Sequence, residues 1–97
     1  MPNQVIVFHM KNCPACHEYL PRFKRLAVKY RAHLHIRTVD INVSDKRIQD
    51  AAIAFKIEAA PTTLVLNEKD KVLKRKTGGI PDTEIAKLLQ FAAGEST

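Results

Sequence analysis

The two cysteines of this 97-residue chain, Cys13 and Cys16, are spaced as a C-x-x-C pair, and this pair constrains the fold more than any other feature. An apolar run of strand-forming residues, Gln4–Phe8, leads directly into the pair. Pro14 suits the first turn of a helix, where the N–H that proline lacks would be unpaired anyway. The chain is therefore expected to pass from a strand into a helix here, with Cys13 at the helix N-terminus and Cys16 one turn further along the same face.

A cysteine at a helix N-terminus faces unpaired backbone amides and the positive end of the helix dipole, which stabilise a thiolate. The thiolate is the attacking species in disulfide exchange, and a second thiol one turn away can resolve the mixed disulfide. We therefore predict Cys13 as the nucleophile and Cys16 as the resolving thiol. The predicted redox group is the Cys13–Cys16 disulfide itself, with no other cofactor and no metal.

Two structural interpretations of the cysteine pair are weaker. A structural zinc site needs further ligands, but the chain has no second cysteine pair, and its histidines do not follow the usual ligand spacing (His9, His17, His33 and His35). A purely structural disulfide between residues three apart would remove little entropy from the unfolded chain. The redox interpretation is therefore favoured.

Length and composition indicate one small globular domain, which we assign to residues 1–97 with a frayed tail at 95–97. Apolar residues make up 45% of the chain, enough for a single core. The apolar segment Val5–Phe8 is too short for a secretory signal, and no run approaches the length of a membrane span. We expect a monomeric cytoplasmic protein with reduced thiols and no membrane partner.

Basic residues outnumber acidic ones, 16 against 10, which gives a net charge of +6. Such a charge can indicate a nucleic-acid-binding protein, and five basic residues crowd the first predicted helix: Arg22, Lys24, Arg25, Lys29 and Arg31. No aromatic pattern suited to base stacking accompanies them, so a solvated helix face is the better interpretation. The charge could also steer acidic partner proteins towards the molecule.

Hydrophobic periodicity predicts an α/β chain whose elements follow the order strand, helix, strand, helix, strand, strand, helix. After the strand Gln4–Phe8, we predict a helix from Pro14 to about Arg31 and a strand Leu34–Ile41. A second helix follows, capped by Ser44 or Asp45, with an apolar stripe of Ile48, Ala51, Ala52 and Phe55. The last elements are the strands Thr62–Leu66 and Val72–Thr77 and a helix from Pro81-Asp82 to near Gly94, whose buried residues are Ile85, Leu88, Leu89 and Ala92. The first two strands should be parallel, and the last two should form an antiparallel hairpin. Lys71, Lys74 and Lys76 suit an exposed sheet edge.

Four motifs together resemble the thioredoxin family. They are the C-x-x-C pair at the first strand-to-helix junction, Pro21 five residues after the second cysteine, the stretch Phe55–Thr62 that ends in Pro61-Thr62, and the pair Gly78-Gly79. The resemblance implies a minimal thioredoxin-like fold, a four-stranded mixed sheet flanked by helices in the order β-α-β-α-β-β-α. It also implies a cis Pro61 beside the cysteines, with the backbone of Ala60 free to pair with an extended substrate and Gly78-Gly79 in the partner-docking surface.

The chain departs from the thioredoxin pattern at several positions. It begins at what would be the family's second strand, and a proline directly after the first cysteine is typical of glutaredoxins. Val7 replaces the buried acid that is thought to assist proton transfer at the resolving thiol. His9, two residues from Val7 on the same strand face, and His17, adjacent to Cys16, are therefore the candidates for proton transfer.

The resemblance predicts a protein-disulfide reductase whose partners are disulfide-containing proteins and a reductase or glutathione for recycling. Two alternatives stay open. One is a glutaredoxin-like, glutathione-dependent reductase, in which Gly78-Gly79 and Asp82 would bind the tripeptide. The other is a non-catalytic adaptor that binds a protein partner. Nucleic acid is not an expected partner.

Overall fold

A four-stranded sheet forms the centre of the structure, a computed structural model that describes residues 2–94. The strands are β1 (Gln4–His9), β2 (His35–Asp40), β3 (Thr62–Leu66) and β4 (Val72–Thr77), and they lie side by side in the order β2-β1-β3-β4. β1 is parallel to β2 and antiparallel to β3, and β3 is antiparallel to β4. The predicted mixed sheet and the predicted hairpin are thus confirmed, with β2 and β4 at the two edges.

The central strand β1 is apolar on both faces because both faces are covered. Val5 and Val7 of β1 belong to one buried cluster, and Ile6 and Phe8 belong to another on the opposite face. This explains why the sequence of β1 is a continuous apolar run instead of an alternating one.

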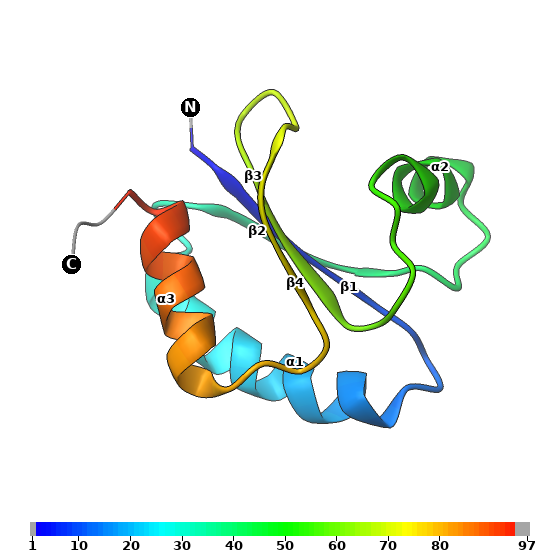
Figure 1. Cartoon of the computed structure of the whole chain (residues 1–97), viewed down its shortest axis with the longest axis horizontal. Helices are drawn as coiled ribbons and strands as arrows, with labels where there is room; N and C mark the ends of the chain where they lie inside the picture. Colours follow the sequence, from blue (N-terminus) through cyan, green and yellow to red (C-terminus); the bar gives the residue numbers. More distant parts are fainter. Residues whose placement is uncertain (1, 95–97) are drawn as a thin grey trace.

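Helices α1 (Pro14–Ala27) and α3 (Asp82–Ala92) pack together over one face of the sheet (Figure 1). All four apolar residues predicted for the last helix are buried there: Ile85, Leu88, Leu89 and Ala92. α1 continues through Pro21. The Gly94 amide donates to Phe91 O just after α3, close to the predicted end of the helix.

The end of the first helix differs from the prediction of a helix to about Arg31. α1 ends at Ala27, and a 3₁₀ turn, η1 (Val28–Tyr30), follows it. The carbonyl oxygen of Tyr30 accepts hydrogen bonds from the amides of His33 and Leu34, 2.9 Å away in each case. The tighter turn keeps Tyr30 in the core while the chain reverses towards β2.

Helix α2 (Lys46–Ala54) lies on the other side of the sheet (Figure 1). Its N-cap is Asp45, one of the two residues predicted, and the Asp45 side chain accepts a hydrogen bond from the Arg47 amide. No residue of α2 is fully buried. Its predicted apolar stripe is therefore only half-buried, and this face of the sheet is less completely covered than the face beneath α1 and α3.

No helix within residues 2–94 is long and apolar enough to cross a membrane. The predicted frayed tail, residues 95–97, lies outside the described residues.

Candidate active site

Cys13 and Cys16 lie at the N-terminus of α1, where the sequence predicted them. Cys13 is the N-cap residue, in extended conformation, and the backbone N–H of Cys16 donates to its sulfur across 3.1 Å. The two residues are joined as a disulfide, with their Cα atoms 5.2 Å apart. Cys13 is half-buried, whereas Cys16 is fully buried. An incoming substrate therefore reaches Cys13 before Cys16.

The loop before β3 lies against Cys13. The peptide bond between Ala60 and Pro61 is cis, as the resemblance implied, and the carbonyl oxygen of Ala60 lies 3.6 Å from Cys13 Sγ. Within the described chain, no hydrogen bond uses the Ala60 N–H. A free backbone edge thus lies directly beside the more accessible sulfur.

The glycine pair lies next to the same loop. The Gly78 amide donates to Pro61 O across 2.7 Å, and Gly78 has a φ of +87°, a left-handed conformation that favours glycine. Gly79 lies beside the Tyr19 side chain of α1. The structure thus brings three segments, distant in sequence, to one end of the molecule.

His9 lies at the end of β1 and is half-buried. Burial lowers its pKa, and the positive charge of Lys24 acts in the same direction, while the carboxylate of Asp40 opposes both. The ring is therefore neutral near pH 7 and can accept a proton.

His17 is exposed, and its Nε2 lies 2.6 Å from the carbonyl oxygen of Lys11. Because a carbonyl oxygen only accepts, Nε2 is the donor in this contact. None of the hydrogen bonds among residues 2–94 joins His9 or His17 to a cysteine sulfur. Their role in proton transfer stays a prediction.

A buried hydroxyl pair, which the sequence did not predict, lies next to Val7. Val7 is fully buried and pairs across the sheet with Thr63. The Thr63 hydroxyl lies 2.9 Å from the Tyr19 hydroxyl. Burial raises the pKa of Tyr19, so the phenol stays protonated. A threonine inside a fully buried strand was the available signal, since a buried hydroxyl requires a partner.

Arg22 connects α1 to the loop after the glycine pair. Its guanidinium bonds Glu18 one turn earlier, the carbonyl oxygen of Ile80 at 3.0 Å and the carboxylate of Asp82 at 2.8 Å. The Arg22 hydrogen bond is the main cause of the lowered pKa of Asp82. Arg22 thus clamps α1 to the start of α3. The basic helix face is therefore only partly solvated, in contrast to the prediction.

In the part of the chain that the structure describes, no three His, Cys, Asp or Glu side chains come together as a metal site.

Comparisons with known proteins agree with this geometry. Residues 2–93 match the family model described as "Thioredoxin-like domain". The comparison with curated protein sequences gives no significant match.

Three solved structures have closely similar backbones. The germline-specific thioredoxin Deadhead of Drosophila melanogaster aligns with a TM-score of 0.78 at 19% identity, over 93% of this chain and 80% of that one. Thioredoxin-2 of the malaria parasite, described as a component of its protein secretion machinery, aligns with a TM-score of 0.77 at 22% identity, over 93% of this chain and 82% of that one. The thioredoxin of Fasciola hepatica aligns with a TM-score of 0.77 at 20% identity, over 94% of this chain and 81% of that one. At these identities the likeness shows the fold alone.

Proposed function

The chain belongs to the thioredoxin-like family, and on that basis we propose that it reduces disulfide bonds in protein substrates. A C-x-x-C pair in this fold indicates an oxidoreductase in general. The observation that carries the narrower proposal is the position of Cys13. Its sulfur accepts the Cys16 N–H at a helix N-terminus and lies 3.6 Å from a free stretch of backbone at Ala60.

The reaction starts from the dithiol form. The Cys13 thiolate attacks one sulfur of the substrate disulfide, so the substrate S–S bond breaks, a mixed disulfide forms and the other substrate sulfur leaves as a thiolate that takes up a proton. Cys16 then loses its proton and attacks Cys13 Sγ. The second substrate thiol leaves, two electrons have passed to the substrate, and the Cys13–Cys16 disulfide remains.

Substrate binding uses the loop beside Cys13. An extended substrate segment pairs with the backbone of Ala60, in the manner of an added strand, and Gly78-Gly79 provides a surface without side chains next to it. The Gly78 amide is bonded to Pro61 O, so the two parts of this surface are held together.

The buried Cys16 must lose a proton in the second step, and Val7 cannot accept it. His9 is our first candidate for the acceptor because its lowered pKa keeps the ring neutral. His17 is the second. We further propose that the protein acts as a cytoplasmic monomer, recycled by a reductase or by glutathione.

Insulin reduction with dithiothreitol tests the proposal. The wild type should accelerate precipitation of the insulin B chain, and Cys13→Ser should abolish the acceleration. In a separate reaction from which dithiothreitol has been removed, pre-reduced Cys16→Ser should instead accumulate a mixed disulfide with the substrate, visible by mass spectrometry. An inactive wild type that still binds protein partners would favour the adaptor alternative, and activity only with glutathione mixed disulfides would favour the glutaredoxin-like one.

A further inference from the structure

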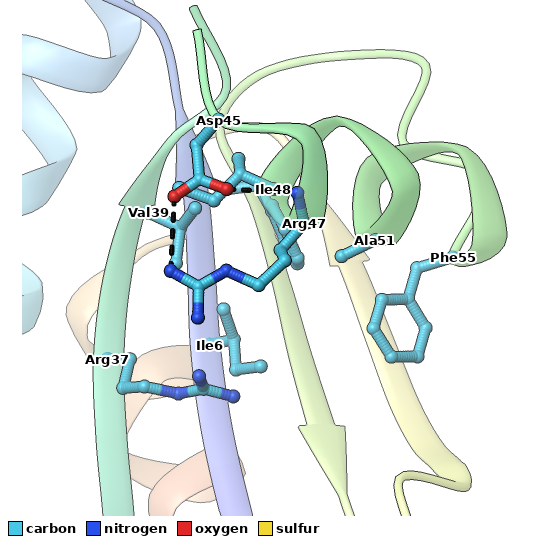
Figure 2. Close-up of a pocket in the computed structure, with 9 residues that line it drawn as sticks. Ile6, Arg37, Val39, Asp45, Arg47, Ile48, Ala51 and Phe55 are labelled. Carbon is cyan, nitrogen blue, oxygen red and sulfur yellow. Dashed lines mark hydrogen bonds and ion pairs between the residues drawn. The ribbon is translucent and has the colours of Figure 1, made fainter. Parts of the chain in front are cut away.

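A pocket of about 380 Å³ lies between α2 and the sheet face opposite α1 and α3 (Figure 2). Most of its lining is apolar and comes from β1, β2, α2 and the residue after α2: Ile6, Phe8, Val39, Ile48, Ala51 and Phe55. None of the residues proposed for disulfide exchange lines it. It is therefore a separate feature of the molecule.

The pocket exists because α2 packs against the sheet mainly at its C-terminal end. There the ring of Phe55 packs on Phe8, with ring centroids 6.3 Å apart. Towards the N-terminus of α2, Ala51 and Ile48 face the sheet, and both are only half-buried. The methyl group of Ala51 is short, and the side chains of Val39, Ile48 and Phe55 are only half-buried around the space, whereas Ile6 and Phe8 of β1 are buried beneath it.

Two guanidinium groups lie at this apolar surface. Arg37 of β2 and Arg47 of α2 extend towards the same space beside Ile6 (Figure 2). Arg37 makes a 3.2 Å hydrogen bond to the neutral side chain of Gln4. Of the residues that line the pocket, only Asp45 accepts a hydrogen bond from either guanidinium group.

Asp45 is the only acid that lines the pocket among residues 2–94. One carboxylate oxygen caps α2 by accepting the Arg47 amide at 2.9 Å, and the other lies 3.4 Å from the Arg47 guanidinium. The contacts with Arg47 also lower the pKa of Asp45, so the group is ionised at neutral pH. The lining thus holds one carboxylate and two guanidinium groups, which leaves a net positive charge at the pocket.

We propose that this pocket binds a small amphiphilic anion, a carboxylate with an apolar tail. The carboxylate accepts hydrogen bonds from Arg37 and Arg47, and the tail packs on the half-buried side chains of Val39, Ile48 and Phe55. The volume falls within the range of about 300–1,000 Å³ that is usual for small-ligand sites. A small ligand is favoured over a partner helix because α2 and the sheet enclose the space from two sides.

The test uses decanoate as the probe, below its micellar concentration, with decanol and decyltrimethylammonium as the neutral and cationic analogues. Two-dimensional ¹H–¹⁵N NMR of the full chain should show saturable shifts of the Ile6, Val39 and Ala51 amides with decanoate. Decanol should bind more weakly, and the cation should leave these amides unchanged. Absence of saturable shifts with decanoate, or equal binding of all three probes, would overturn the proposal.

Variants distinguish binding in the pocket from attraction of the anion by the net charge of the protein. The double variant Arg37→Gln with Arg47→Gln should weaken decanoate binding by about tenfold or more and leave decanol binding unchanged. The matched control, Lys69→Gln with Lys87→Gln, removes the same charge outside the pocket and should bind decanoate as the wild type does. An equal loss in both double variants would show that net charge alone attracts the anion.

A third variant, Ala51→Leu, tests the location of the tail. It should fill the space and abolish binding of both decanoate and decanol, while a thermal melt reports whether the protein is folded. If an amphipathic peptide of glutamate and leucine shifts the pocket amides and decanoate does not, the pocket is a protein-docking groove and the proposal is wrong.

Discussion

Cys13 differs from Cys16 in exposure and in the groups around its sulfur. It is the N-cap of α1, and its sulfur accepts the Cys16 N–H across 3.1 Å. Such hydrogen bonds favour the thiolate. We predict that iodoacetamide modifies Cys13 with a midpoint at least one pH unit below the free-cysteine reference of about 8.5. Mass spectrometry of Cys16→Ser across pH values measures this, and a midpoint near the reference value would contradict an activated thiolate.

His9 should make stability depend on pH. Burial lowers the pKa of His9 below its unfolded value of about 6.5, so the unfolded chain binds its proton more readily. The contribution of neutral His9 to the free energy of unfolding is therefore complete above about pH 6.5, the unfolded pKa. It is lost as the pH falls through about 6.5 towards the folded pKa.

We predict that His9→Gln lessens the fall in stability between about pH 7.5 and 5.5, as measured by urea unfolding. His33→Gln is the matched control, because it removes an exposed histidine that is not among the groups shifting the pKa of His9, and it should keep the slope of the wild type. The same His9 variant should slow insulin reduction and change its pH profile. An unchanged profile would remove His9 from the mechanism.

The hydroxyl pair of Tyr19 and Thr63 is fully buried beside Val7. Tyr19→Phe leaves the Thr63 hydroxyl without this partner, which should cost about 1–3 kcal/mol of unfolding free energy. The double variant Tyr19→Phe with Thr63→Val should lose clearly less unfolding free energy than the sum of the losses in the two single variants, because both polar groups are then absent. Urea unfolding of the two single variants and the double variant completes the cycle, and strictly additive effects would show that the hydroxyls do not interact.

At the level of elements, the start of α3 is held against α1 through Arg22. This side chain bonds the Ile80 carbonyl and the Asp82 carboxylate, and Arg25 bonds the same carboxylate at 2.8 Å. The glycine pair immediately precedes this clamp in the chain. The clamp therefore fixes one side of the proposed substrate surface.

We predict that Arg22→Gln raises the KM for a protein substrate by about two- to fivefold and leaves the alkylation midpoint of Cys13 unchanged. Loosening the loop should weaken substrate docking without altering the N-terminus of α1. Insulin-reduction kinetics and iodoacetamide titration measure the two effects. Arg31→Gln is the control, since Arg31 has no ion pair among the described residues. A normal KM in Arg22→Gln would show that the clamp does not position the loop.

At the level of the whole molecule, the net charge of +6 acts on a substrate at longer range than any single contact does. A positive field speeds the encounter with acidic proteins, and salt screens it, with a Debye length of about 8 Å at physiological ionic strength. We predict that the reduction rate of an acidic disulfide peptide falls at least about threefold between low salt and 0.5 M salt. A neutral peptide of the same length is the control. Equal salt dependence of the two peptides would exclude steering by charge.

Local pattern predicted most of the elements to within one or two residues, and the two larger differences have tertiary causes. Helical spacing predicted α1, but the burial of Tyr30 and the reversal towards β2 convert its last turn into a 3₁₀ turn. The same spacing predicted α2, but not that its apolar stripe would be half-buried. A period of 3.6 residues identifies the face that a helix buries, and it carries no information on how closely the neighbouring element approaches.

The sequence by itself determined which residues carry the redox chemistry, because the C-x-x-C pair, the helix start at Pro14 and the apolar strand before it are neighbours along the chain. Only the tertiary structure decided what surrounds them. Ala60 lies beside Cys13, Thr63 bonds Tyr19 and Asp82 bonds Arg22, although 44 to 60 residues separate the hydrogen-bonded partners. The Arg-lined pocket under α2 arises in the same way. Local spacing is set by backbone geometry, whereas such contacts exist only after the whole chain has packed.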